Sequence, residues 1–144
     1  MADIRRIDDT ISVAPQISAG DVAEAKALGF VAIVNNRPDG EEPGAPQGDE
    51  IGTAVATAGL AYAAIPITHS GFSHPQIDAM VAALKGADGP VLAYCRSGTR
   101  SCNLWALARA KMGDDPAVLI AKGAAAGYDL NGIRPLLETL SGKA

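Results

Sequence analysis

Two short, wholly apolar segments restrict most strongly how this chain can fold. Residues 30–34 read FVAIV and residues 90–94 read PVLAY, and polar residues follow each segment within one or two positions. Runs this short and this uniformly apolar are typical of strands that are buried on both faces. Because helix patterns separate these strands, the sequence predicts an α/β fold with a mainly parallel central sheet flanked by helices.

Helix signals between the apolar segments define the remaining expected elements. Ser18 with Asp21, and Ser73 with Gln76, form two capping boxes, and each precedes a stretch with helical spacing. A Gly- and Pro-rich segment at residues 39–48 predicts a loop. We expect strands at residues 11–17, 30–34, 60–67 and 90–94, and helices between Ser18 and Gly29, after Ser73, and at residues 49–58, 102–112, 116–126 and 132–140.

Composition limits the classes of function. The 144 residues are 48% hydrophobic and carry a net charge of −4, which predicts one globular domain over residues 1–144 without nucleic acid as a partner. The apolar runs are too short to cross a membrane, and no secretory signal is visible, so we expect a cytoplasmic protein. Two cysteines and two histidines stand in no metal-ligand spacing, and we expect neither a metal nor another cofactor.

Polar segments follow three of the predicted strands. They read NNR (residues 35–37), THS (residues 68–70) and YCRSGTRS (residues 94–101). Because the carboxyl ends of parallel strands meet at one edge of a sheet, where ligands bind, these segments are expected to form the functional site.

The third segment joins a strand to a helix and begins with Cys95. The helix dipole, the loop amides and Arg100 would all favour a thiolate there, so we interpret Cys95 as a nucleophile in covalent catalysis. The alternative is a purely structural role, in which Cys95 is a buried cysteine at the end of a strand. Arg100 supplies a fixed positive charge that can bind an anion in a bidentate manner.

The residues between and beside Cys95 and Arg100 have expected supporting roles. The backbone amides of Arg96, Ser97, Gly98 and Thr99 would cradle the anion. The Arg96 side chain should point outward, either attracting an anionic substrate or standing as a solvated surface charge. The Ser101 hydroxyl can donate a hydrogen bond that holds the thiolate ionised.

Three further residues have two open interpretations each. Arg37 either lines the same edge of the sheet or lies on the surface. His69 either serves the cysteine site or is an ordinary polar loop residue. Cys102 either acts as a resolving thiol for Cys95 or, as we favour, packs in the core.

The motifs as a set resemble a known family. The order of elements resembles the dual-specificity phosphatase fold, and YCRSGTRS with LWAL (residues 104–107) and AGYD (residues 126–129) resembles the bacterial beta-lactamase hydrolase-like, phosphatase-like domain family. The resemblance covers nearly the whole chain. Members of that family have been described both as phosphatases and as sulfurtransferases, so the resemblance implies either reaction.

Two departures from the phosphatase pattern decide our expectation. Tyr94 rather than histidine precedes Cys95. Four residues rather than five separate Cys95 from Arg100, a spacing that resembles the active loop of rhodaneses. No aspartate follows residues 65–67, although Asp39, Glu41, Glu42 and His69 remain alternative acids.

We therefore expect a sulfurtransferase that carries sulfane sulfur as a Cys95 persulfide. Its partners would be a small anionic sulfur donor, such as thiosulfate or a persulfide, and a thiol acceptor. The alternative is a cysteine-dependent phosphatase that acts on a phosphorylated substrate through a Cys95 phosphocysteine. A third possibility is an inactive module that binds anions or phosphoproteins.

Overall fold

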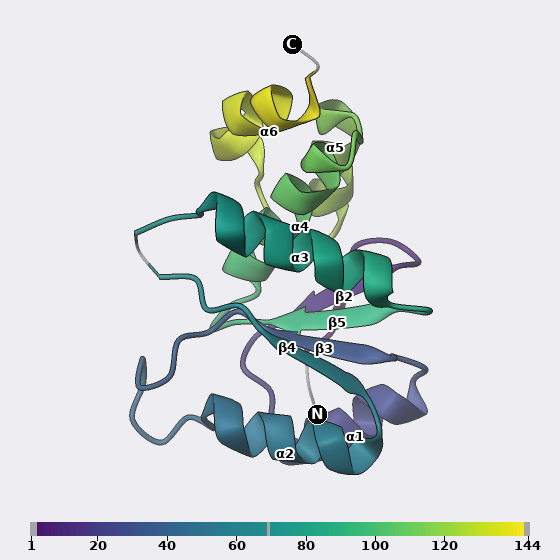
Figure 1. The fold of residues 1–144 in the computed structure, drawn as a ribbon, viewed down its shortest axis with the longest axis vertical. Helices are drawn as coiled ribbons and strands as arrows, with labels where there is room; N and C mark the ends of the chain where they lie inside the picture. Colours follow the sequence, from purple (N-terminus) through teal and green to yellow (C-terminus); the bar gives the residue numbers. More distant parts are fainter. Residues whose placement is uncertain (1–2, 69, 143–144) are drawn as a thin grey trace.

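A five-stranded sheet forms the centre of the computed structural model, which describes residues 3–68 and 70–142. The strand order is β1-β2-β5-β3-β4, with β1 antiparallel to β2 and the other neighbouring pairs parallel. Strands alternate with helices along most of the chain, which confirms the α/β prediction (Figure 1). The strands are β1 (Arg5–Arg6), β2 (Ile11–Ala14), β3 (Ala32–Asn35), β4 (Ala61–Ala64) and β5 (Val91–Tyr94).

Helices cover both faces of this sheet. One face carries α1 and α2, and the other carries α3 and α4, with α5 and α6 packed further out against α4 (Figure 1). No helix within the described residues is long and apolar enough to span a membrane. The helices are α1 (Ala19–Ala27), α2 (Gly48–Ala58), α3 (His74–Gly86), α4 (Thr99–Lys111), α5 (Pro116–Ala125) and α6 (Arg134–Ser141), with a short 3-10 helix at Asn131–Ile133.

The central strands are buried on both faces, as their apolar sequences predict. In β5, Val91 and Ala93 face the core beneath α3 and α4, whereas Leu92 and Tyr94 face the core beneath α1 and α2. This alternation follows from the two-residue period of a strand. Helix α4 is buried along most of its length and therefore fixes the position of the segment that leads into it.

The parallel strands end in register at one edge of the sheet. Tyr94, the last residue of β5, lies beside Ala14 on one side and Asn35 on the other, and Asn35 lies beside Ala64. The segments that follow β2, β3, β4 and β5 therefore leave the sheet from one row of residues. This confirms that the polar segments after the strands share an edge.

Several element boundaries differ from those expected. Helix α4 begins at Thr99 rather than at residue 102, because Gly98 in a left-handed conformation lets the chain turn directly into the helix. Strand β4 ends before Pro66, which has no amide to donate to a neighbouring strand. Strand β2 ends at Ala14 instead of residue 17, and the edge strand β1 was not predicted. Both capping boxes are present as expected.

The burial of α4 predicts a large loss of stability on truncation of its core side chains. Leu107→Ala should lower the free energy of unfolding by about 2 to 5 kcal/mol, because it opens a cavity in a fully buried site. Leu28→Ala is the matched control, since this leucine is 61% exposed at the end of α1, and its effect should stay within about 0.5 kcal/mol. Urea unfolding measures both, and equal effects would contradict the assigned core.

Candidate active site

Cys95 lies directly after β5 and before the amino end of α4. Its backbone amide donates to the carbonyl of Ala14 on the neighbouring strand at 3.3 Å, and its side chain is fully buried. The backbone amide of Gly98 donates to the Cys95 Sγ at 3.1 Å. The sulfur therefore lies against a loop amide at the amino end of α4, where a helix presents the positive end of its dipole.

The loop keeps its shape through a contact between Gly98 and Tyr128. Gly98 has φ of +90°, and a Cβ added there would lie 2.2 Å from the Tyr128 Oη. The same Tyr128 hydroxyl donates to the backbone oxygen of Ser97 at 3.1 Å. Sequence patterns predicted no role for Tyr128, because this contact joins two segments that are far apart in the chain. Only glycine satisfies both the backbone conformation and the close approach.

Arg100 lies in the first turn of α4 and binds a carboxylate with both of its terminal nitrogens. Nη1 donates to Glu41 Oε2 at 2.8 Å, and Nη2 donates to Glu41 Oε1 at 2.7 Å. Nη1 also donates to the backbone oxygen of Ile67, which follows β4, at 2.8 Å. Hydrogen bonds to Glu41 raise the pKa of Arg100 above its ordinary value, and the nearby Cys95 contributes in the same direction.

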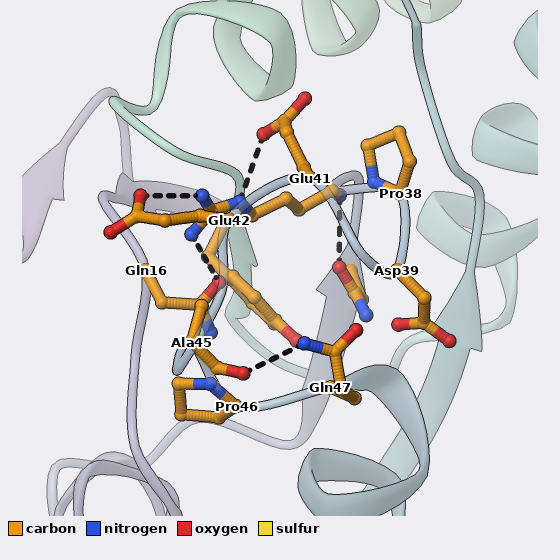
Figure 2. A pocket seen from close by; sticks show the side chains of 11 residues that line it. Gln16, Pro38, Asp39, Glu41, Glu42, Ala45, Pro46 and Gln47 are labelled. Carbon is orange, nitrogen blue, oxygen red and sulfur yellow. Dashed lines mark hydrogen bonds and ion pairs between the residues drawn. The ribbon is translucent and has the colours of Figure 1, made fainter.

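Arg37 is buried beside this pair, which excludes the interpretation that it is a surface residue. Its side chain is only 5% exposed. Nε donates to Glu41 Oε1, Nη1 to Gln16 Oε1 and Nη2 to Glu42 Oε2, each at 2.9 Å. Figure 2 shows Gln16, Glu41 and Glu42 arranged around this site, with the hydrogen bonds as dashed lines. Arg37 thus holds the loop between β3 and α2 together and joins it to the segment after β2.

Glu41 is therefore shared by two guanidinium groups. Hydrogen bonds from Arg100, reinforced by Arg37, lower the pKa of Glu41 to about 2, although partial burial opposes this shift. The sequence named Glu41 as one of several possible acids but gave no sign of its ion pair with Arg100, since 59 positions separate the two residues. The carboxylate occupies the donors with which Arg100 would bind an external anion.

Ser101 and Cys102 are both buried in the first turn of α4. The Ser101 Oγ has no hydrogen-bond partner among the described residues. Burial, followed by the nearby Cys95, raises the pKa of the Cys102 thiol to about 12. Cys102 packs in the hydrophobic core, as favoured from the sequence, and such a thiol is a poor nucleophile.

The remaining predicted site residues include Arg96, Ser97, Thr99 and His69. The Arg96 side chain is 67% exposed, as expected, and its Nε lies 3.9 Å from Glu42 Oε2. The hydroxyls of Ser97 and Thr99 lie 3.0 Å apart in a hydrogen bond within the loop. His69 lies outside the described residues. Within those residues, no group of three or more histidine, cysteine, aspartate or glutamate side chains is placed to hold a metal ion.

A cysteine held by a loop amide, followed by an arginine in the first turn of a buried helix, can attack an anionic group that the arginine binds. This loop on a parallel sheet with helices on both faces defines a cysteine-dependent phosphatase-like protein. The chain belongs to the family described as "Beta-lactamase hydrolase-like protein, phosphatase-like domain", whose sequence model matches residues 3–112. It is 37% identical over 105 residues to a beta-lactamase hydrolase-like protein of Agrobacterium fabrum. The match covers 73% of this chain and 24% of the relative. The chain thus spans about a quarter of the length of that curated relative.

Solved structures show the same fold. A candidate phosphatase from Neisseria meningitidis has a TM-score of 0.80 and 31% identity, and the match covers 95% of this chain and 97% of the other. Tk-PTP in its active form has a TM-score of 0.73 at 19% identity, and the match covers 98% and 97% of the two chains. These similarities confirm the fold and the family that the sequence motifs implied.

The expected sulfurtransferase activity, with its sulfur donor and thiol acceptor, is contradicted by these comparisons. The matched family is described as phosphatase-like, and the similar structures are of phosphatase-type proteins. The expectation that the chain is an enzyme is supported by these phosphatase-like relatives. The error arose because the four-residue spacing between Cys95 and Arg100, and the lack of an aspartate after residues 65–67, were interpreted as features of a rhodanese-like loop. Arg100 instead lies inside α4, from which its guanidinium still reaches across to Ile67 and Glu41.

The contact between Gly98 and Tyr128 predicts a strained loop in Gly98→Ala. We expect this variant to lose about 1 to 3 kcal/mol of unfolding free energy, because alanine disfavours the left-handed conformation and meets the Tyr128 hydroxyl. Adding Tyr128→Phe should recover part of the loss. Gly86→Ala is the control, since a Cβ there meets no atom within 4 Å. A loss no larger than that of the control in urea unfolding would refute the constraint.

The low pKa of Glu41 predicts a pH-dependent contribution to stability. Its folded value of about 2 lies below the ordinary 4.5, so the contribution is complete above pH 4.5 and disappears as the pH falls towards 2. Glu41→Gln should therefore cost about 1 to 2 kcal/mol at pH 7, after allowance for solvent screening, and progressively less below pH 4.5. Urea unfolding between pH 2.5 and 7 measures this, with exposed Glu50→Gln as the control; a gap that stays constant with pH would contradict the ion pair.

Proposed function

We propose that this chain hydrolyses phosphate monoesters through a phosphocysteine formed on Cys95. The observation that carries this proposal is the arrangement of Arg100, whose two terminal nitrogens bind a carboxylate at the loop that holds the Cys95 sulfur. A guanidinium that binds a carboxylate in this way has the geometry to bind two oxygens of a phosphate. The family and the similar structures support the same reaction.

In the first step, the Cys95 thiolate attacks the phosphorus of the bound ester. An S–P bond forms while the P–O bond to the alcohol or phenol breaks, and the leaving oxygen takes a proton. The amides of residues 96–100 and the Arg100 guanidinium hold the phosphoryl oxygens, where charge is greatest in the transition state. The amide of Gly98, which now donates to Sγ, is one of these donors.

In the second step, water attacks the phosphorus of the phosphocysteine. The S–P bond breaks, inorganic phosphate leaves and the Cys95 thiolate is restored, so the thiolate is the leaving group. The Ser101 hydroxyl is buried in the first turn of α4 without another partner among the described residues. The structure shows no hydrogen bond from this hydroxyl to the Cys95 sulfur, and we assign it one to the departing thiolate, beside the bond that the Gly98 amide already donates.

The substrate is proposed as a class, a phosphorylated molecule with an accessible ester. A TpbA variant of Pseudomonas aeruginosa, 18% identical with a TM-score of 0.64, was solved in complex with phosphotyrosine, which supports an aryl phosphate as the first probe. The exposed guanidinium of Arg96 next to the loop would attract such an anion.

Hydrolysis of 4-nitrophenyl phosphate tests the nucleophile. Cys95→Ser should lower turnover by at least about 10³-fold, because a serine hydroxyl is far less ionised than a cysteine thiol. Cys102→Ala is the matched control, since that thiol is buried in the core, and its turnover should stay within about twofold. An acid quench of the wild type should also trap one phosphoryl group on the peptide that contains Cys95.

Two outcomes would overturn the proposal. Turnover that survives in Cys95→Ser would exclude the phosphocysteine. Binding of phosphate by the wild type without any turnover of aryl phosphates would instead favour a module that binds anions and has no catalytic activity.

A further inference from the structure

Glu41 already occupies the face of Arg100 that a phosphate needs. Its two carboxylate oxygens accept hydrogen bonds from Nη1 and Nη2, while Nη1 also donates to the Ile67 oxygen. A phosphate bound in a bidentate manner requires the same two nitrogens. The ester and Glu41 therefore cannot both bind Arg100 through this pair of nitrogens.

The contacts of Glu41 allow it to leave Arg100 without leaving the site. Glu41 Oε1 also accepts from Arg37 Nε at 2.9 Å, and Arg37 is itself fixed by Gln16 and Glu42. Glu41 lies in a loop segment that forms neither helix nor strand, between β3 and α2. A rotation of its side chain about the contact with Arg37 would release Arg100 and keep the carboxyl group beside the bound ester.

We propose that Glu41 is an internal ligand of Arg100 which the phosphate ester displaces, and that the displaced carboxyl group then donates the proton to the leaving oxygen. This inference rests on the proposed phosphatase function and adds to it a residue for the proton transfer. It also assigns the free state as one in which the anion site is filled by the chain's own carboxylate.

Displacement changes the charges around Glu41 in the direction that proton donation requires. In the free state two guanidinium groups hold the carboxylate ionised. After displacement, Arg100 is neutralised by the ester and a phosphate dianion lies nearby, so the protonated carboxyl group becomes favoured. The proton comes from solvent or from the monoanionic form of the ester.

The proton count then balances over both steps. As the P–O bond breaks, the Glu41 carboxyl group gives its proton to the leaving alkoxide or phenolate and becomes a carboxylate. When water attacks the phosphocysteine, that carboxylate takes the proton which the water loses. After inorganic phosphate leaves, the Glu41 carboxyl group returns its proton to solvent, and the ionised carboxylate binds Arg100 again.

The other carboxylates of this loop are committed elsewhere. Asp39 Oδ1 accepts from the backbone amide of Gly48 at 2.7 Å, at the start of α2. Glu42 binds Arg37 and approaches Arg96 at 3.9 Å. Within the described residues, Glu41 is the carboxylate for which a hydrogen bond to Arg100 is found, and the described part of the segment after β4 holds no aspartate or glutamate before Ser73.

The test compares Glu41→Gln with Glu42→Gln, which removes the same charge from the next position, and with Asp39→Asn, the rival acid. Inorganic phosphate binding is measured by calorimetry, and turnover is measured with phenyl phosphate and with 4-nitrophenyl phosphate. Phenolate is the poorer leaving group and depends more on a proton donor.

Glu41→Gln should bind phosphate at least about tenfold more tightly, because the competing charge is gone. Its turnover of phenyl phosphate should fall about 10²-fold, and that of 4-nitrophenyl phosphate much less. Glu42→Gln and Asp39→Asn should leave the ratio of the two turnover rates within about twofold of the wild type. This combination of tighter binding and slower turnover of the poor leaving group is not expected from a structural defect.

Other outcomes separate the parts of the proposal. Unchanged phosphate affinity in Glu41→Gln would overturn the displacement. Equal losses on both substrates, or a selective loss in Asp39→Asn, would overturn proton donation by Glu41. If the wild type hydrolyses neither ester, the phosphatase function fails and proton donation with it, whereas calorimetry on Glu41→Gln still supports or overturns the displacement.

Discussion

The guanidinium group of Arg100 joins three parts of the chain at the edge of the sheet. It projects from the first turn of α4, donates to the carbonyl of Ile67 after β4, and binds Glu41 in the loop after β3. Each contact is possible because the parallel strands end in register, which brings these segments together. A partly buried positive charge requires an anion, so a fold that places Arg100 here also requires a partner for it.

Charge balance explains why one carboxylate is shared by two arginines. Arg37, Arg100, Glu41 and Glu42 carry two positive and two negative charges, and Arg37 is almost completely buried among them. A phosphate dianion added to this group would leave an excess of two negative charges. Protonation of Glu41 halves that excess, so the same electrostatics that hold Glu41 ionised in the free protein favour its protonation once an ester is bound.

Local patterns in the sequence predicted the local parts of the structure. The buried strands, both capping boxes and the segment from Cys95 to Arg100 follow from neighbouring residues, and all are present. The contacts that shape the site were not predictable in this way, because Glu41 and Tyr128 reach it from distant positions. The sulfurtransferase interpretation failed for a related reason: loop length is a local feature, whereas the anion site is built from segments far apart in sequence.

The contact with Tyr128 shows how far the site extends along the chain. The family match ends at residue 112, whereas Tyr128 lies in the segment after α5. Its hydroxyl can pack against the loop only because Gly98 lacks a side chain. That hydroxyl donates to the Ser97 carbonyl and thereby orients the peptide that follows, whose amide belongs to Gly98 and meets the Cys95 sulfur. A tyrosine outside the matched region thus sets the direction of the amide that any anion at Cys95 would encounter. The packing of α5 against α4 positions this tyrosine. It therefore helps to shape the anion site, as the loop itself does.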